Sequence, residues 1–199
     1  MMSPPQRSSF MRSTTLVRSV GERHPTLTRA LHWATAILIV ISVTAILCRE
    51  TTEEKLVRRV LLELHRQLGL LVLVALAVRI GLRLGGAFAS HTRDLGARLR
   101  LVATVAHWLM YGVLGAVTLL GWALSSAHGI HLAFLAVLPL PDVVAADSDL
   151  ADTLSDYHVL AAWLLLALVA LHVLAALWHH YFRRDGVLMA MLPGRRVAR

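Results

Sequence analysis

The sequence has very little cysteine and few acidic residues. Cys48 is the single cysteine among 199 residues, which excludes an internal disulfide. The chain also lacks the CxxCH motif that attaches haem covalently and the CxxC motifs that bind zinc or do redox chemistry. There are 12 acidic residues against 20 lysines and arginines, so the formal net charge is +8. Hydrophobic residues make up 57% of the chain, far more than a soluble domain of this size tolerates.

Charged residues are rare in four long stretches, and their scarcity there predicts membrane spans. The apolar stretches cover about 30–48, 63–84, 101–124 and 157–180. Each approaches the roughly 20 residues that a helix needs to cross about 30 Å of hydrocarbon. The helices of a soluble bundle would carry polar faces, which these stretches barely have. We therefore predict an all-α membrane protein, a four-transmembrane-helix bundle.

The segments outside the spans differ in composition. Residues 1–22 are rich in serine, threonine and arginine, and we expect them to be a disordered basic extension. Residues 23–193 would form the four-helix domain, and residues 194–199 a basic tail. The third connection, 125–156, contains the apolar stretch Ile130–Leu140, which is too short to cross a membrane. We expect that stretch to lie on the membrane surface or to fold back against the bundle.

Positive charge recurs on every second connection. The segment before Ala30, the region from Arg79 to Arg100 around the second connection, and the C-terminal segment each hold five arginines against one acidic residue. The third connection has five aspartates and neither lysine nor arginine, and the first is mixed, with four basic and three acidic residues. The positive-inside rule then places both the N- and C-termini in the cytoplasm. Because topology accounts for the charge, no nucleic-acid partner is needed.

Histidine is frequent, and several of the eleven copies lie in or beside the spans. A polar ring in hydrocarbon is costly and usually has a partner. His158 and His172 enclose thirteen residues without a charge. Fourteen residues make almost four helical turns, so the two rings share a face but lie about 21 Å apart. This spacing suits two separate sites stacked across a bilayer. Imidazole commonly binds haem iron, and facing helices can supply one ring each.

Each site needs a second histidine at a matching depth. With the N-terminus inside, His32 matches His172 near the inner face, and His65 matches His158 near the outer face. The spacing fits two haem b groups, held by axial bonds within the pairs His32/His172 and His65/His158. Gly69 follows His65 by four residues on the same face, where a flat porphyrin needs room. The alternative for any one of these histidines is a hydrogen bond between helices.

Three further residues are expected near the inner site. His107 could contact a quinone or a haem edge, or form an ordinary hydrogen bond. His179 could serve the same quinone site as a proton donor, or simply lie at the interface. Arg79 follows His65 by fourteen residues, which places it about 21 Å deeper. Its guanidinium could bind a haem propionate or a quinone carbonyl, or extend to the cytoplasmic surface.

Four segments resemble the bacterial cytochrome b561 family. They are TRALHW, ELHRQLG, AHWLMYG and YHVLAAW…ALHVLAALWHHYF, and the resemblance extends over about Glu22–Pro193. It implies a four-helix, di-haem b, multi-pass protein of the bacterial cytoplasmic membrane. The family's haem ligands correspond to His32, His65, His158 and His172. One type of member moves electrons from periplasmic superoxide to membrane ubiquinone, and related haem-b subunits serve hydrogenases and formate dehydrogenases.

Three functions remain to be distinguished on this basis. The first is a superoxide:quinone oxidoreductase that uses ubiquinone or another quinone. The second is a haem-b conduit for another periplasmic redox partner, since the acidic third connection suits a basic soluble protein better than a small anion. The third is a haem-free transporter or structural bundle in contact with membrane lipid. Transporters place broken helices or acids near the midplane, and the first, third and fourth spans contain no Asp or Glu.

The charge distribution predicts the topology. We expect a reporter fused after Arg199 to read cytoplasmic and one inserted near Asp147 to read periplasmic, because arginine-rich segments stay inside. Alkaline phosphatase and fluorescent-protein fusions measure this directly. The opposite pattern would reverse the inner and outer assignment of both histidine pairs.

Overall fold

The computed structural model describes residues 26–85 and 97–192, which form four long helices. These are α1 (Thr26–Thr51), α2 (Lys55–Leu84), α3 (Ala97–Ala127) and α4 (Ser148–Trp178). All four are long and apolar enough to cross a membrane, which confirms the predicted four-span helical architecture. The extension predicted for residues 1–22 and the tail predicted for residues 194–199 lie outside the described residues.

The helices are longer than the apolar stretches that predicted them. The second begins at Lys55 rather than near residue 63, and the fourth at Ser148 rather than near residue 157. Capping explains both differences. The Asp147 carboxylate accepts a hydrogen bond from the Leu150 backbone N–H at 3.0 Å, and Glu54 caps α2 in the same way. Hydropathy marks only the segment in hydrocarbon, whereas a cap determines where the helix begins.

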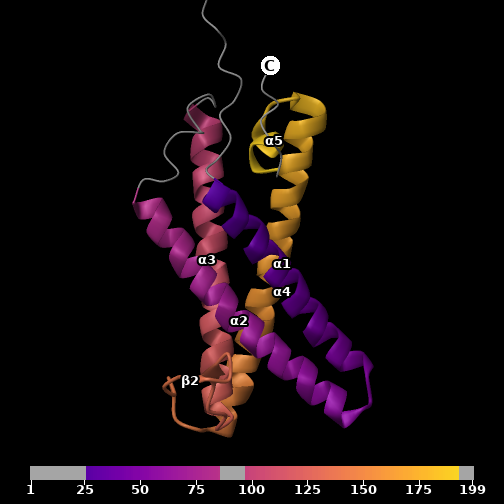
Figure 1. Cartoon of the computed structure of the whole chain (residues 1–199), viewed down its shortest axis with the longest axis vertical. Helices are drawn as coiled ribbons and strands as arrows, with labels where there is room; N and C mark the ends of the chain where they lie inside the picture. The colour runs from indigo at the N-terminus through magenta and orange to yellow at the C-terminus, as the bar shows by residue number, and fades with distance from the viewer. Residues whose placement is uncertain (1–25, 86–96, 193–199) are drawn as a thin grey trace, which may run out of the picture.

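The four helices form two antiparallel hairpins that cross (Figure 1). Helix α1 packs along α2, and α3 along α4, and the hairpins meet through α2 and α3. The α1–α2 turn and the connection between α3 and α4 lie at one end, which we call the turn end. A π-helical turn (His179–Arg183) and the short α5 (Val187–Met191) lie at the other, which we call the terminal end.

The apolar part of the third connection folds back against the bundle. This was one of its two predicted positions; the other was the membrane surface. It forms a small hairpin in which β1 (Ala133–Phe134) pairs with β2 (Leu138–Pro139). The Gln67 amide of α2 holds it: Nε2 donates to the Ala133 carbonyl at 3.0 Å, and Oε1 accepts from the Leu135 N–H at 2.9 Å. These bonds satisfy backbone groups at the hairpin tip and attach it to α2.

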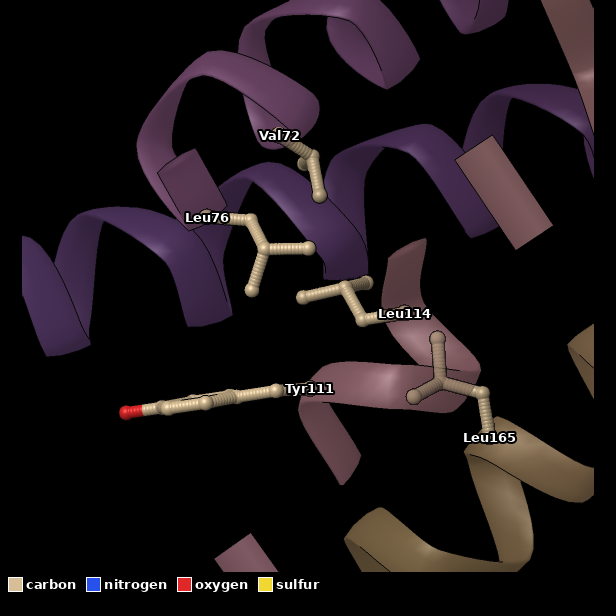
Figure 2. Close-up of a cluster of buried hydrophobic side chains, with 5 residues drawn as sticks. All are labelled: Val72, Leu76, Tyr111, Leu114 and Leu165. Atoms are coloured by element: carbon tan, nitrogen blue, oxygen red, sulfur yellow. The ribbon is translucent and has the colours of Figure 1, made fainter. Parts of the chain in front are cut away.

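A small apolar cluster lies where the hairpins cross. Figure 2 shows Val72 and Leu76 of α2, Tyr111 and Leu114 of α3 and Leu165 of α4 packed together. Most other large apolar side chains of the described residues face outward, as is expected when hydrocarbon rather than water surrounds the protein. Leu165 lies seven residues from both histidines of α4, so the cluster separates two levels of the bundle.

Candidate functional site

At the turn end, His65 of α2 and His158 of α4 lie close together. Their ring centroids are 6.1 Å apart, and the ring planes are nearly perpendicular at 89°. These residues are the predicted outer pair, brought together from helices far apart in the sequence. Their role as metal ligands stays a prediction.

Both rings of this turn-end pair are oriented by backbone carbonyls. The Nδ1–H of His65 donates to the Ser42 carbonyl of α1 at 3.0 Å, and the Ser42 hydroxyl lies 3.0 Å from the same nitrogen. The Nδ1–H of His158 donates to the Val117 carbonyl of α3 at 2.9 Å. With Nδ1 engaged in this way, Nε2 is the nitrogen left to bind a metal. Histidine ligands in metal sites are held by the same kind of bond.

Two glycines shape the surroundings of this pair. A Cβ at Gly121 of α3 would lie 3.0 Å from Cε1 and 3.3 Å from Nδ1 of His158, so only glycine lets the ring approach α3 this closely. A Cβ at Gly69 would meet no atom of the described residues within 4 Å. The predicted role of Gly69, leaving room for a flat ring, is untested, and the open space around it is compatible with that role.

At the terminal end, three histidines from three helices converge. The ring centroids of His32 (α1) and His172 (α4), the predicted inner pair, are 6.3 Å apart with an interplanar angle of 57°. His107 of α3 lies 5.5 Å from His172, edge to face. Its Nδ1–H donates to the Ala103 carbonyl at 2.5 Å. His107 therefore lies beside the predicted inner pair, at the level that the sequence predicted for it.

Arg79 reaches the terminal-end cluster from α2. Its Nη2 donates to Nδ1 of His32 at 3.4 Å, and its guanidinium carbon lies 5.4 Å from the ring centroid of Tyr111. Arg83, one turn further, lies over the rings of both Trp108 at 5.2 Å and Tyr111 at 5.8 Å. The side chain of Arg79 therefore lies at the level of the inner pair, and its partner there is a histidine of the pair itself.

His179 lies beyond this cluster in the π-helical turn. Its Nδ1 is 2.5 Å from Oδ2 of Asp185, and Nε of Arg183 is 3.7 Å from the same oxygen. Neighbouring α5 covers the start of α1, where Arg29 and Trp33 donate to the Leu192 and Met191 carbonyls at 3.2 and 2.8 Å. His179 thus belongs to a polar group at the boundary of the bundle.

Sequence reasoning missed Ser42, Gly121 and Tyr111. Ser42 is one of three hydroxyl residues in the first span, and only the structure shows that it is buried against His65. Gly121 resembles any other small residue in a membrane helix, where glycine is common. Its contact with His158 depends on how α3 and α4 pack, which the sequence alone does not encode locally.

Comparison with known proteins identifies the family. The model of the prokaryotic cytochrome b561 family matches residues 23–194. The chain belongs to this family. It is 30% identical over 167 residues to the probable superoxide oxidase CybB of Yersinia pestis, covering 83% of this chain and 93% of that protein. It is also 28% identical over 170 residues to cytochrome b561 homolog 1 of Escherichia coli (strain K12), covering 83% and 94%.

As a cytochrome b561, the protein is a multi-pass inner-membrane cytochrome of an electron-transport family that uses haem b. The histidine pairs fit that group. A metal–nitrogen bond is about 2 Å long, so two imidazoles on one ion hold their nitrogens about 4 Å apart. Each ring centroid lies about one ring radius beyond its nitrogen, so the two centroids are further apart than the two nitrogens by about two ring radii. The observed separations of 6.1 and 6.3 Å agree with this expectation.

The Gly121 contact gives a test of the turn-end pair. We expect Gly121→Val to displace the His158 ring and to reduce b-type absorbance per protein by about half, with overpacking costing about 1–3 kcal/mol of stability. Visible spectra and thermal unfolding of the purified protein measure both effects. Gly81→Val is the control, because a Cβ there meets no described atom within 4 Å. Equal haem content in the two variants would contradict the assignment.

Proposed function

We propose that this protein is a di-haem b cytochrome that transfers electrons between a periplasmic donor and the quinone pool. Its first candidate reaction is the oxidation of superoxide coupled to the reduction of ubiquinone. One observation carries the proposal: two histidine pairs of similar separation lie at two levels of one bundle, linked by His158 and His172 on α4. Fourteen helical residues separate these levels by about 21 Å.

Four side chains would hold the two groups: His65 and His158 at the turn end, His32 and His172 at the terminal end. When bound, haem supplies a reversible one-electron couple at its iron. The protein contributes orientation. The Ser42 and Val117 carbonyls hold the Nδ1 protons of the turn-end rings, which would leave Nε2 of each ring to bind the iron.

The terminal-end pair would have a different electrostatic environment. Arg79 donates to Nδ1 of His32, which therefore accepts. If Nε2 of His32 binds iron, Nδ1 carries a proton and no longer accepts from Arg79. The guanidinium is then released to another acceptor at this level. A haem propionate is the first such partner we propose, and a quinone carbonyl is the second.

A quinone site is proposed at the terminal end because proton-carrying groups gather there. Quinone reduction consumes two electrons and two protons. His107 lies beside His172, and His179 forms a close pair with the Asp185 carboxylate. Such a pair can hold a proton between Nδ1 and Oδ2 and pass it on. The positive-inside orientation would place this end in the cytoplasm.

The donor decides between the two redox functions. The name of the Yersinia pestis relative, probable superoxide oxidase, supports superoxide. The aspartates of the third connection favour the alternative, a conduit for a basic periplasmic redox protein, because an acidic face repels a small anion.

Stopped-flow mixing of the purified protein with superoxide, and separately with a quinol, tests the proposal. Rapid haem reduction by superoxide followed by reoxidation with ubiquinone is expected. Reduction by quinol alone would favour the conduit.

The pairing predicts the result of two single substitutions. We expect His158→Ala and His172→Ala each to lose one haem, and a different one, because each variant leaves the opposite pair intact. Haem per protein should fall by about half in each, and redox titration should leave a different midpoint potential in each. His128→Ala, in the third connection and exposed, is the control. Two low-spin haems in both variants would overturn the pairing.

A second prediction concerns Arg79. We expect Arg79→Gln to lower the midpoint potential of the terminal-end haem by tens of millivolts and to leave the other unchanged, because a nearby positive charge stabilises the reduced state. About 1.4 kcal/mol corresponds to about 59 mV for one electron. Arg79→Lys keeps the charge and should shift the potential less. Potentiometric titration measures this. Unmoved potentials with full haem content would mean that Arg79 only extends to the surface.

A further inference from the structure

Helix α3 carries three rings toward the terminal end, in the segment AHWLMYG. His107 lies against His172 of α4. Trp108 and Tyr111 lie against two arginines of α2. The proposed electron-transfer site uses His107 and Arg79 but gives no role to the ring of Tyr111. This ring is 6% exposed and belongs to the apolar cluster of Figure 2, so packing fixes its position.

The face of the Tyr111 ring attracts two guanidinium groups. The guanidinium carbon of Arg79 lies 5.4 Å from the ring centroid, and that of Arg83 lies 5.8 Å from it. Both distances are within the roughly 6 Å over which a cation is attracted to an aromatic face. Trp108 meets Tyr111 edge to face and also lies 5.2 Å from Arg83. Arg83 is therefore shared between two rings, whereas Arg79 has the Tyr111 ring alone among the tyrosine, tryptophan and phenylalanine rings that the structure describes.

These ring contacts matter because neither arginine forms an ion pair within the described part of the chain. The ion pairs found there involve other cations. A guanidinium stays charged and is costly in hydrocarbon, so it either has a partner or extends toward water. An aromatic face attracts a cation more strongly where water is excluded. The buried Tyr111 ring therefore opposes the extension of Arg79 to the membrane surface.

The ring becomes the main partner of Arg79 in the state that the proposed function requires. Nη2 of Arg79 donates to Nδ1 of His32 at 3.4 Å, which is long for a hydrogen bond. When Nε2 of His32 binds iron, Nδ1 carries a proton and no longer accepts this bond. Among the described contacts of Arg79, the Tyr111 face then remains. The ring thereby determines whether the positive charge stays beside the histidine pair.

We propose that Tyr111 is a positioning residue, whose ring keeps the Arg79 guanidinium at the level of the His32/His172 pair and thereby raises the midpoint potential of the haem held there. A positive charge stabilises the reduced form, and its effect falls with distance. Tyr111 acts through Arg79 and not on the haem itself. The inference rests on the proposed function, because it requires a haem at the terminal end.

The test is a double-mutant cycle on the midpoint potentials of the purified haem-loaded protein. We expect Tyr111→Leu to lower the terminal-end potential by at least about half of the shift caused by Arg79→Gln, and to leave the turn-end potential unchanged. Tyr111→Phe keeps the aromatic face and should keep the parent potential. In the Arg79→Gln background, Tyr111→Leu should cause no further shift, because the cation through which the ring acts is gone.

Val72→Ala is the matched control for lost packing. Val72 belongs to the same cluster as Tyr111 and lies seven residues from both His65 and Arg79 on α2. The variant should lower the unfolding temperature and move neither potential, because it removes buried methyl groups and leaves the cation and the ring in place. If Tyr111→Leu does not assemble, Tyr111→Met takes its place, since methionine is long and apolar but has no ring.

Four outcomes would overturn the proposal. The first is an unmoved terminal-end potential in Tyr111→Leu with both haems present. The second is an undiminished shift in the Arg79→Gln background, which would mean that the ring acts directly on the haem. The third is an equal shift in Tyr111→Phe, which would assign the effect to the hydroxyl. The fourth is an equal shift in Val72→Ala, which would assign it to packing.

Failure of the proposed function is distinguishable from failure of this inference. A parent protein without two b-type titration steps would remove both. Two steps in the parent protein, with a terminal-end step that responds to Arg79→Gln but not to Tyr111→Leu, would remove only the role of Tyr111.

Discussion

The packing of α2 against α3 at the centre of the bundle determines the position of every functional group. Val72 and Leu76 contact Tyr111 and Leu114 there, and Leu165 of α4 closes the cluster. Because the helices are rigid rods with a rise of about 1.5 Å per residue, one contact in the middle sets the level of all side chains along them. A shift of one helix by a single turn would separate both histidine pairs at once.

The low-polarity surroundings add a second requirement, which the histidines meet through backbone carbonyls. A ring N–H in hydrocarbon needs an acceptor. The carbonyls of Ser42, Val117 and Ala103 provide it for His65, His158 and His107. In a helix most carbonyls are already engaged, so each of these bonds depends on the ring lying close to the helix surface. Gly121 shows the consequence, because it allows such an approach for His158.

The two ends of the bundle differ in chemistry although both carry a histidine pair. At the turn end the pair is oriented by neutral carbonyls, and the cations lie further out, at the α1–α2 turn. At the terminal end a guanidinium contacts the pair directly, and a third histidine lies against it. A nearby positive charge favours the reduced form of a redox group, so groups held at the two ends would differ in midpoint potential.

The sequence by itself determined the four spans, the levels of the histidines and the family. Hydropathy sets a span because burying charge in hydrocarbon is costly, and the helical period sets the separation of His158 from His172; both are properties of one segment. Only the tertiary structure decided which side chains meet. It brought His107 to His172, aimed Arg79 at His32, and set Gly121 of α3 against the ring of His158. These contacts depend on the rotation and crossing of whole helices, which packing across the bundle sets and no single stretch of sequence encodes.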